Sequence, residues 1–294
     1  MTNHTHLAGI VPVANSGIDF ATNVPVCMLP INESMVVIQK SIVECAVAGC
    51  QTIWIVANDD MAPIIRKTIG DWVYDPVYYN RKHKYPSEVR KEIPIYYVPI
   101  LPKNRDRRDS YGWSVLSGIH SAWFVANKLS KWLVPEKYYI SFPYGMYDIY
   151  QLREHRREIS NPNYNFFLTH EGKNVKHGLQ LPFTMMAEDF KKCRQYVNSE
   201  TTRTYYNTDE QYPSKKLPLS ERWSARSFDF ETVFKEINEA SAVKLNTDWF
   251  FQLDSWENYV NYISSKNHIQ MPKEPLTKAH KHVKLTTMED NCEK

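Results

Sequence analysis

The stretch AGIVPVANSGIDFATNVPVCMLPINESMVVIQKSIVECAVAGCQTIWIVA, residues 8–57, decides the fold. It begins with the short apolar run Ala8–Ala14, which predicts a buried strand. It ends with Gln51–Ala57, where β-branched and aromatic residues are dense enough to predict a second buried strand. Because a helix is expected between them, the two strands predict a βαβ unit and a parallel pairing.

The helix of this unit is expected over Met35–Ala46, where apolar residues recur at helical spacing. This spacing leaves Lys40 and Glu44 to face water. Gly49 follows directly, and glycine is typical of the residue that ends a helix in a left-handed conformation.

Strands and helices continue to alternate up to residue 150. This order predicts an α/β fold of three layers, with a mainly parallel central sheet flanked by helices. The expected third strand contains two prolines, which are typical of the beginning of a strand or of a strand near an edge of the sheet. The expected elements are a helix over Met61–Ile69, a strand over Ile93–Ile100, a helix over Ser110–Ser130 and a strand over Tyr138–Phe142.

The C-terminal half is more mixed and reads as an elaborated part of the same domain. We expect residues 1–150 to form a nucleotide-binding-like half, residues 151–272 to complete the domain, and residues 273–294 to form a polar tail. Residues 199–220 lack periodicity and are expected to form a long excursion. The other expected elements are strands over 164–169, 178–181 and 247–253, and helices over 186–197, 230–239 and 255–263.

The composition excludes several classes of protein. The 294 residues carry 36 Lys and Arg against 33 Asp and Glu, a net charge of +3 that gives no signal of nucleic-acid binding. No apolar run is long enough for a membrane span, and the first residues lack the order of a signal peptide. The five cysteines form no C-x-x-C pair, which predicts isolated thiols in the cytoplasm of a cell or of an infected host.

Three segments, in the right order, resemble one family. The segments that carry the resemblance are the phrases MLPI, AGC and IWIV within residues 8–71, SYGWSVLSGIHSAW at 110–123 and WFFQLDSWENYVNYI at 249–263. They resemble sugar-phosphate nucleotidyltransferases. The resemblance implies the GT-A-like fold of nucleotide-diphospho-sugar transferases. It also implies transfer of a nucleotidyl group from a nucleoside triphosphate to a sugar phosphate with Mg²⁺. The abundance of Tyr, Asn and Lys is similar in style to proteins of marine tailed phages.

The resemblance places a nucleotide site in the loop after the first strand and at the start of the helix from Ser110. In that loop Gly17 can take a positive φ, and the Asn15 and Ser16 side chains can bond phosphate oxygens. An ordinary strand-to-loop turn is the alternative. The positions concerned are Val13, Ala14, Asn15, Ser16, Gly17 and Gly112.

Two cationic side chains of the family pattern are missing. Asp19 stands where the family has a loop arginine, and Val26 stands where it has a lysine. The loop that contains Asp19 is about three residues shorter than the corresponding loop of the family. Charge-assisted hydrogen bonds contribute about 1.5–3 kcal/mol each, so both losses weaken stabilisation of the transition state. The nearby Arg105, Arg107 and Arg108 could supply the missing cations. The alternative is that these arginines only form a solvated part of the surface.

Two aspartates are candidate ligands for Mg²⁺, namely Asp148 and Asp254. Asp254 matches the late acidic position of the family, whereas Asp148 is the nearest carboxylate after the fourth strand, which lacks the family's Gly-Asp ending. One or two carboxylates with substrate phosphates suffice for Mg²⁺. The alternative for each is to cap the helix that follows.

Three functions remain open at this point. The first is a nucleotidyltransferase that binds a nucleoside triphosphate. The second is a catalytically degenerate family member that acts as a binding or structural protein, including a virion-associated one with a protein assembly partner. The third is a glycosyltransferase that takes a nucleotide sugar, although no D-x-D motif follows the fourth strand.

Overall fold

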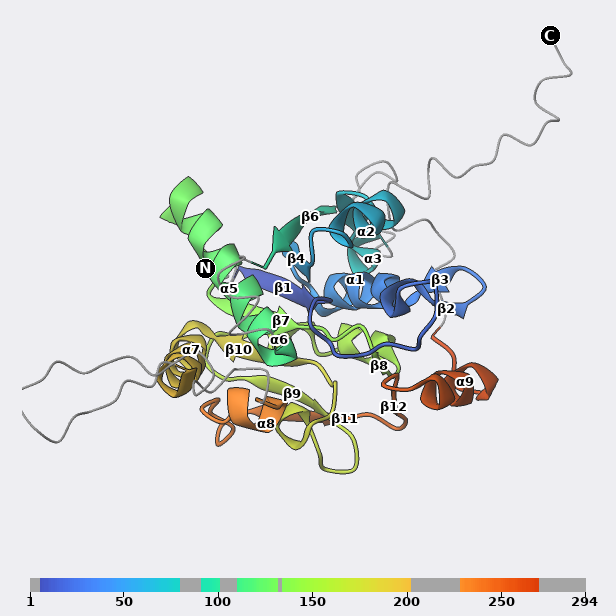
Figure 1. Ribbon diagram of the computed structural model, residues 1–294. Helices are drawn as coiled ribbons and strands as arrows, with labels where there is room; N and C mark the ends of the chain where they lie inside the picture. The colour runs from blue at the N-terminus through green and yellow to red at the C-terminus, as the bar shows by residue number, and fades with distance from the viewer. Residues whose placement is uncertain (1–5, 80–90, 101–109, 132–133, 202–227, 270–294) are drawn as a thin grey trace, which may run out of the picture.

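A computed structural model describes residues 6–79, 91–100, 110–131, 134–201 and 228–269 (Figure 1). Its centre is an eight-stranded sheet in the order β11-β9-β10-β7-β1-β4-β6-β5. The pairs β1–β7, β1–β4, β4–β6 and β9–β11 are parallel, whereas β10 and β5 run antiparallel to their neighbours. The strands are β1 (Leu7–Pro12), β4 (Thr52–Ala57), β5 (Trp72–Tyr74), β6 (Glu92–Pro99), β7 (Lys137–Ile140), β9 (Phe166–Thr169), β10 (Phe183–Met186) and β11 (Val243–Asn246).

The remaining elements flank this sheet or extend its carboxyl edge (Figure 1). Two small antiparallel ribbons pair β2 (Pro30–Asn32) with β3 (Met35–Val36), and β8 (Gly145–Met146) with β12 (Phe251–Gln252). The helices are α1 (Val37–Ala48), α2 (Ala62–Ile69), α3 (Pro76–Tyr79), α5 (Tyr111–Leu129), α6 (Arg156–Ser160), α7 (Ala187–Thr201), α8 (Phe230–Val233) and α9 (Trp256–Ser264), with 3₁₀ turns η1 (Val26–Met28), η3 (Ile149–Arg153) and η4 (Val175–His177).

Two neighbouring residues of β7 define the three layers. Successive side chains of a strand point to opposite faces of the sheet. The Tyr139 hydroxyl donates to Glu44 Oε1 of α1 at 2.8 Å, whereas the Tyr138 ring lies 6.4 Å from the ring of Phe190 on α7. Helix α5 packs on β1 and β4 and contacts α7. The predicted α/β fold, three-layered and mainly parallel, is therefore confirmed.

Most expected elements are present within a few residues of their predicted ends, and Gly49 has the left-handed φ of 96° expected of a C-cap. The strand expected over 178–181 is wrong, because Gln180 N bonds a side chain, Gln252 Oε1, and the strand begins only at Phe183. The helix expected over 230–239 ends at Val233. Of 247–253 only Phe251–Gln252 is a strand. Nearly all of the expected excursion and the whole polar tail lie outside the described residues.

Lys40 and Glu44 do not face water, which corrects the expectation from helical spacing. Both side chains are fully buried, because α1 is covered by the sheet on one side and by η3, α3 and α6 on the other. Lys40 Nζ donates to Glu44 Oε2 at 2.8 Å and to the carbonyl oxygen of Phe142 at 2.9 Å. It also lies 4.7 Å from the centre of the Tyr147 ring.

Lys137, at the start of β7, is a second fully buried lysine. Its Nζ donates to the carbonyl oxygens of Asn161 and Tyr164 at 2.8 and 2.7 Å. No carboxylate of the described residues forms an ion pair with it, and burial lowers the pKa of Lys137 to about 7.

We expect this lysine to make stability depend on pH. In the unfolded chain a lysine keeps its proton up to about pH 10.4. The folded state releases it above about pH 7. The unfolded state therefore binds more protons between these values, and the folded state gains stability as pH rises, by at most about 1.4 kcal/mol per pH unit. The free energy of unfolding in urea, measured for wild type and Lys137→Met between pH 6 and 9, tests this. The increase in stability with pH should be absent in the variant. Parallel pH profiles for the two proteins would contradict it.

The described cysteines Cys27, Cys45, Cys50 and Cys193 are free and buried. Among the helices that the structure describes, none is long and apolar enough to cross a membrane.

Candidate active site

The carboxyl ends of β1, β4 and β7 meet at one edge of the sheet because these strands are parallel. The loop after β1 is fixed over this edge, since Val13 N and Ala14 N both donate to the carbonyl oxygen of Val56 at 2.8 and 3.0 Å. The start of α5 holds the same loop: Tyr111 Oη donates to the carbonyl oxygen of Pro12 at 3.0 Å, and Ser114 Oγ to that of Ala14 at 2.8 Å. Ligands of open α/β sheets bind in such a position, outside the carboxyl ends of the strands.

Three residues of this loop lie in the left-handed region, namely Asn15 with φ 60°, Gly17 with φ 70° and Ala21 with φ 53°. Space around Gly17 is open, as nothing lies within 4 Å of where a Cβ would stand. Ser16 Oγ accepts a hydrogen bond from Ile18 N at 3.3 Å. The Asn15 amide Nδ2 is buried and has no hydrogen-bond partner in the described structure. It is therefore a donor that a ligand oxygen could satisfy.

The two positions without the family's cations have other uses here. Asp19 is exposed, and its Oδ1 accepts a hydrogen bond from Ala21 N at 2.8 Å. Val26 is buried in the core as the first residue of η1. Among the described residues, no lysine or arginine bonds the loop of residues 13–25. Arg105, Arg107 and Arg108 lie outside the described residues, and the described chain resumes at Ser110.

Gly112 does not face an open cavity. A Cβ at this position would stand 2.9 Å from Cγ2 of Val233, so the glycine permits a close approach of α8. Next to this contact, the Phe230 ring lies 5.5 Å from that of Tyr111 and 4.9 Å from that of Phe142. Helix α8 thus covers the start of α5. The sequence predicted a helix beginning at Phe230, but it did not predict that this helix is only four residues long or that it packs on α5.

The register of β8 and β12 separates the two candidate metal ligands. Gln252 pairs with Gly145, so Asp254 lies two residues beyond this pair and Asp148 three residues beyond it in the opposite direction. Asp148 Oδ1 caps η3 by accepting from Tyr150 N at 2.9 Å, as its alternative role predicted. The register thus places the two aspartates on opposite sides of the Gly145–Gln252 pair.

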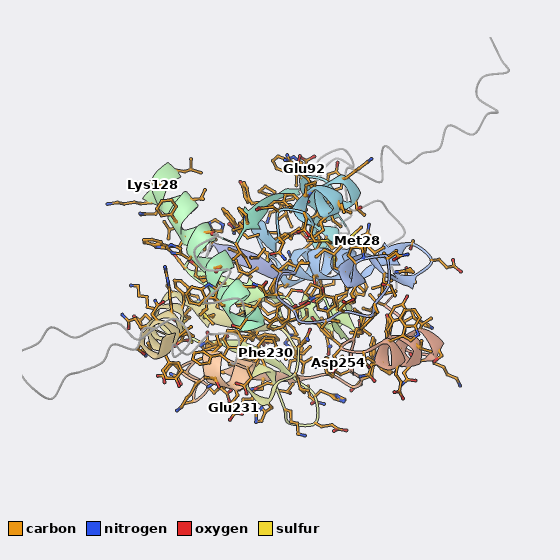
Figure 2. All side chains as sticks on the ribbon, viewed as in Figure 1. Met28, Glu92, Lys128, Phe230, Glu231 and Asp254 are labelled. Carbon is orange, nitrogen blue, oxygen red and sulfur yellow. The ribbon has the colours of Figure 1, made fainter. Side chains whose placement is uncertain are left out.

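Asp254 lies at the carboxyl edge, between β12 and α9 (Figure 2). Leu253 N donates to the carbonyl oxygen of Tyr144 at 2.8 Å, which holds this segment beside the chain that follows β7. Asp254 Oδ1 accepts from Asn258 Nδ2 at 2.6 Å, and Oδ2 from Gln252 Nε2 at 3.4 Å. The cap of α9 is Ser255, which excludes the capping role as the alternative for Asp254.

One carboxylate is the minimum that Mg²⁺ requires when substrate phosphates supply further oxygens. The exposed Asp254 carboxylate, held by two amides, fits this arrangement. The described residues contain no group of three or more His, Cys, Asp or Glu side chains that could hold a metal without a substrate.

Sequence reasoning missed the close contact between Gly145 and Gln180. A Cβ on Gly145 would stand 2.0 Å from the carbonyl oxygen of Gln180. Gln180 N donates to Gln252 Oε1 at 3.0 Å, and Gln180 Oε1 is buried without a partner in the described structure. These residues connect β8 to Asp254. No periodicity in the sequence signals such a contact between distant backbone segments.

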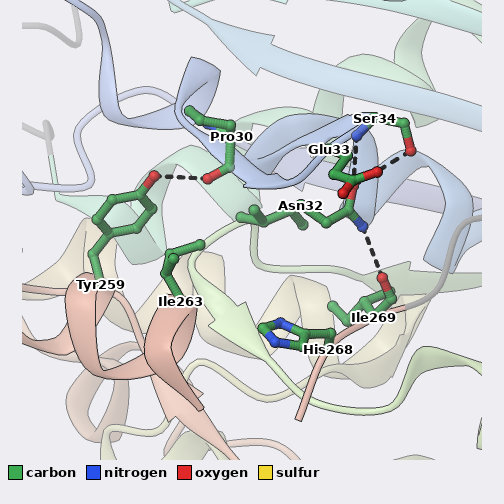
Figure 3. Close-up of a pocket in the computed structure, with 9 residues that line it drawn as sticks. Pro30, Asn32, Glu33, Ser34, Tyr259, Ile263, His268 and Ile269 are labelled. Carbon is green, nitrogen blue, oxygen red and sulfur yellow. Dashed lines mark hydrogen bonds between the residues drawn. The ribbon is translucent and has the colours of Figure 1, made fainter. Parts of the chain in front are cut away.

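A cleft of about 690 Å³ lies elsewhere, between the β2–β3 ribbon and α9 (Figure 3). Tyr259 Oη donates to the carbonyl oxygen of Pro30 at 2.7 Å, and Asn32 Nδ2 donates to that of Ile269 at 2.8 Å. Pro30 of the MLPI phrase therefore holds α9, and the neighbouring Asn32 holds the last described segment of the chain.

No protein-family model and no curated protein sequence matches the chain. Solved structures do match. A putative glucose-1-phosphate thymidylyltransferase from Bacillus anthracis, in complex with a sucrose, has a TM-score of 0.56 at 9% identity, over 91% of this chain and 98% of that one. A UDP-glucose pyrophosphorylase complexed with UDP-glucose has a TM-score of 0.52 at 13% identity, over 88% of this chain and 97% of that one. At these identities the likeness shows the fold, which is the one that the sequence resemblance implied.

Proposed function

We propose that this chain binds a nucleoside triphosphate at the carboxyl edge of the sheet and transfers its nucleotidyl group to a sugar phosphate with Mg²⁺. The observation that carries the proposal is the loop after β1. It is fixed over the edge by four hydrogen bonds, has left-handed residues at 15, 17 and 21, and contains the buried Asn15 amide, which has no partner in the described structure. The fold shared with the two solved structures supports it.

In this proposal the chain binds and orients two anions. The Asn15 amide and the backbone of the turn donate to phosphate oxygens, and Arg105, Arg107 and Arg108 supply the cations that Asp19 and Val26 do not. Asp254 would hold the magnesium ion, which neutralises charge on the departing pyrophosphate when bound. Asp148 remains the cap of η3.

A degenerate binding or structural protein is the second candidate, favoured by a specific contact. Val233 of α8 occupies the space beside Gly112, where the resemblance expects the nucleotide base. Together with the buried Val26, this contact favours a protein that keeps the fold and has lost the chemistry.

Paired aspartate variants test the proposal. In calorimetric titrations with UTP and dTTP, the wild-type chain should bind one of them more tightly with Mg²⁺ than without. Asp254→Asn should lose this metal dependence, with affinity reduced about tenfold or more. Asp148→Asn is the matched control, since asparagine also caps a helix. An equal loss in both variants would contradict the assignment of Asp254. Binding without pyrophosphate release on adding sugar phosphates would favour the second candidate.

A further inference from the structure

A second cavity, of about 380 Å³, lies between α5 and α7 on one face of the sheet. Its wall includes His120 and Trp123 of α5, Tyr138 of β7, and Phe190 and Arg194 of α7. Tyr138 is the second residue of β7, whereas the loop of residues 13–25 lies beyond the opposite, carboxyl end of the parallel strands. Figure 1 shows α5 and α7 on the same side of the molecule, away from α9 and β12. This cavity is therefore separate from the candidate active site.

The charged side chains that the structure describes in the cavity wall are positive. These are Lys191 and Arg194, and no aspartate or glutamate is among the described lining residues. Arg194 Nη1 lies 2.7 Å from His120 Nδ1, and because a guanidinium can only donate, the ring nitrogen accepts this hydrogen bond. Arg194 has no ion pair among the described residues, and burial lowers its pKa. A guanidinium held in this way attracts an anion.

The buried hydroxyl of Tyr138 is independent evidence for a ligand in this cavity. Tyr138 is fully buried and lines the cavity, and its Oη has no hydrogen-bond partner in the described structure. A buried polar group without a partner is unfavourable, so an acceptor in the cavity would satisfy it. Burial raises the pKa of Tyr138, which keeps the hydroxyl protonated as a donor.

The other walls are aromatic. The rings of His120 and Trp123 stack with centres 6.1 Å apart and 20° between their planes. The Phe190 ring lies 6.4 Å from the Tyr138 ring, and the Arg194 guanidinium lies 5.9 Å from the centre of the Phe190 ring. Flat apolar surfaces beside a few convergent polar groups are typical of sites for small organic molecules.

We propose that this cavity binds a small organic anion, a carboxylate or a phosphate carried on an aromatic ring. The anionic group bonds the Arg194 guanidinium and accepts from Tyr138 Oη, and the ring lies against Trp123 and Phe190. The cavity volume falls within the range of small-molecule sites, about 300–1,000 Å³. This site does not depend on the proposed transferase activity.

Calorimetry on the full chain tests the proposal with phenyl phosphate, benzoate and inorganic phosphate as probes. We expect saturable binding of phenyl phosphate or benzoate, and the tighter of the two identifies the anionic group. Arg194→Gln should weaken this binding at least tenfold and Tyr138→Phe about fivefold. Tyr150→Phe is the matched control, because it removes another buried hydroxyl without a partner, on η3, and should bind like wild type.

The Tyr138→Phe variant removes only an unpartnered hydroxyl, so it should fold, and circular dichroism checks this. Asp254→Asn should bind the ring-bearing anion like wild type, which separates this site from the candidate active site. Failure of both ring-bearing anions to bind would overturn the proposal. Binding that survives both Arg194→Gln and Tyr138→Phe would also overturn it, as would inorganic phosphate binding as tightly as phenyl phosphate.

Discussion

Replacing Lys40 with methionine should lower the free energy of unfolding by about 3–5 kcal/mol, because it leaves the Glu44 carboxylate buried without its cation. Both side chains are fully buried, and Lys40 Nζ also donates to the Phe142 carbonyl oxygen at 2.9 Å. That bond joins α1 to the chain at the end of β7. The loss of this hydrogen bond should therefore also weaken the packing of the chain after β7, in which Tyr144 and Gly145 lie beside the candidate site.

Urea unfolding measures this effect, and two variants control it. Lys67→Met removes an exposed lysine of α2 and should change stability by less than about 0.5 kcal/mol. The double variant Lys40→Met/Glu44→Leu removes both charges and should be more stable than Lys40→Met alone. If the free energy of unfolding of Lys40→Met lies within about 1 kcal/mol of the wild-type value, the buried pair of Lys40 and Glu44 does not stabilise the fold as described above.

Gly145→Ala should be destabilising by about 3 kcal/mol or more, because its Cβ would stand 2.0 Å from the Gln180 carbonyl oxygen. A backbone atom cannot move aside as a flexible side chain can. The displacement of Gln180 should also disturb its bond to Gln252 at 3.0 Å, and Gln252 contacts Asp254. We therefore expect both lower stability and weaker Mg²⁺-dependent nucleotide binding.

Gly172→Ala separates crowding from backbone strain. Gly172 has φ 76° with open space around it, so alanine there should cost only about 1–2 kcal/mol. Thermal and urea unfolding of the two variants, with soluble yield as a further measure, give the comparison. Equal losses at both positions would show that the close approach at Gly145 is not the cause.

The fold could be predicted from local signals. The apolar run of β1, the dense β-branched residues of β4 and the αL glycine at Gly49 each depend on a few neighbouring residues. Ser110 likewise caps α5 by accepting from Trp113 N at 3.2 Å. Such local signals were sufficient to predict the fold, which the chain shares with solved structures at only 9–13% identity.

The site could be predicted only in part, because its geometry depends on contacts between distant segments. Lys40 and Glu44 look like water-facing residues until η3, α3 and α6 cover α1. The placement of Asp148 and Asp254 on opposite sides of the Gly145–Gln252 pair follows from the register of two strands of only two residues each, which are too short for any periodicity. The contact of Val233 with Gly112 comes from the four-residue helix α8.

Calorimetric titration of the wild-type chain with UTP, dTTP and UDP-glucose, with and without Mg²⁺, tests the central claim most directly. The claim is that the loop after β1 and Asp254 form a nucleotide site. It predicts one-to-one binding of at least one triphosphate, strengthened by Mg²⁺, with a dissociation constant below about 1 mM. Absence of binding for all three ligands at millimolar concentration, with or without the metal, would contradict it.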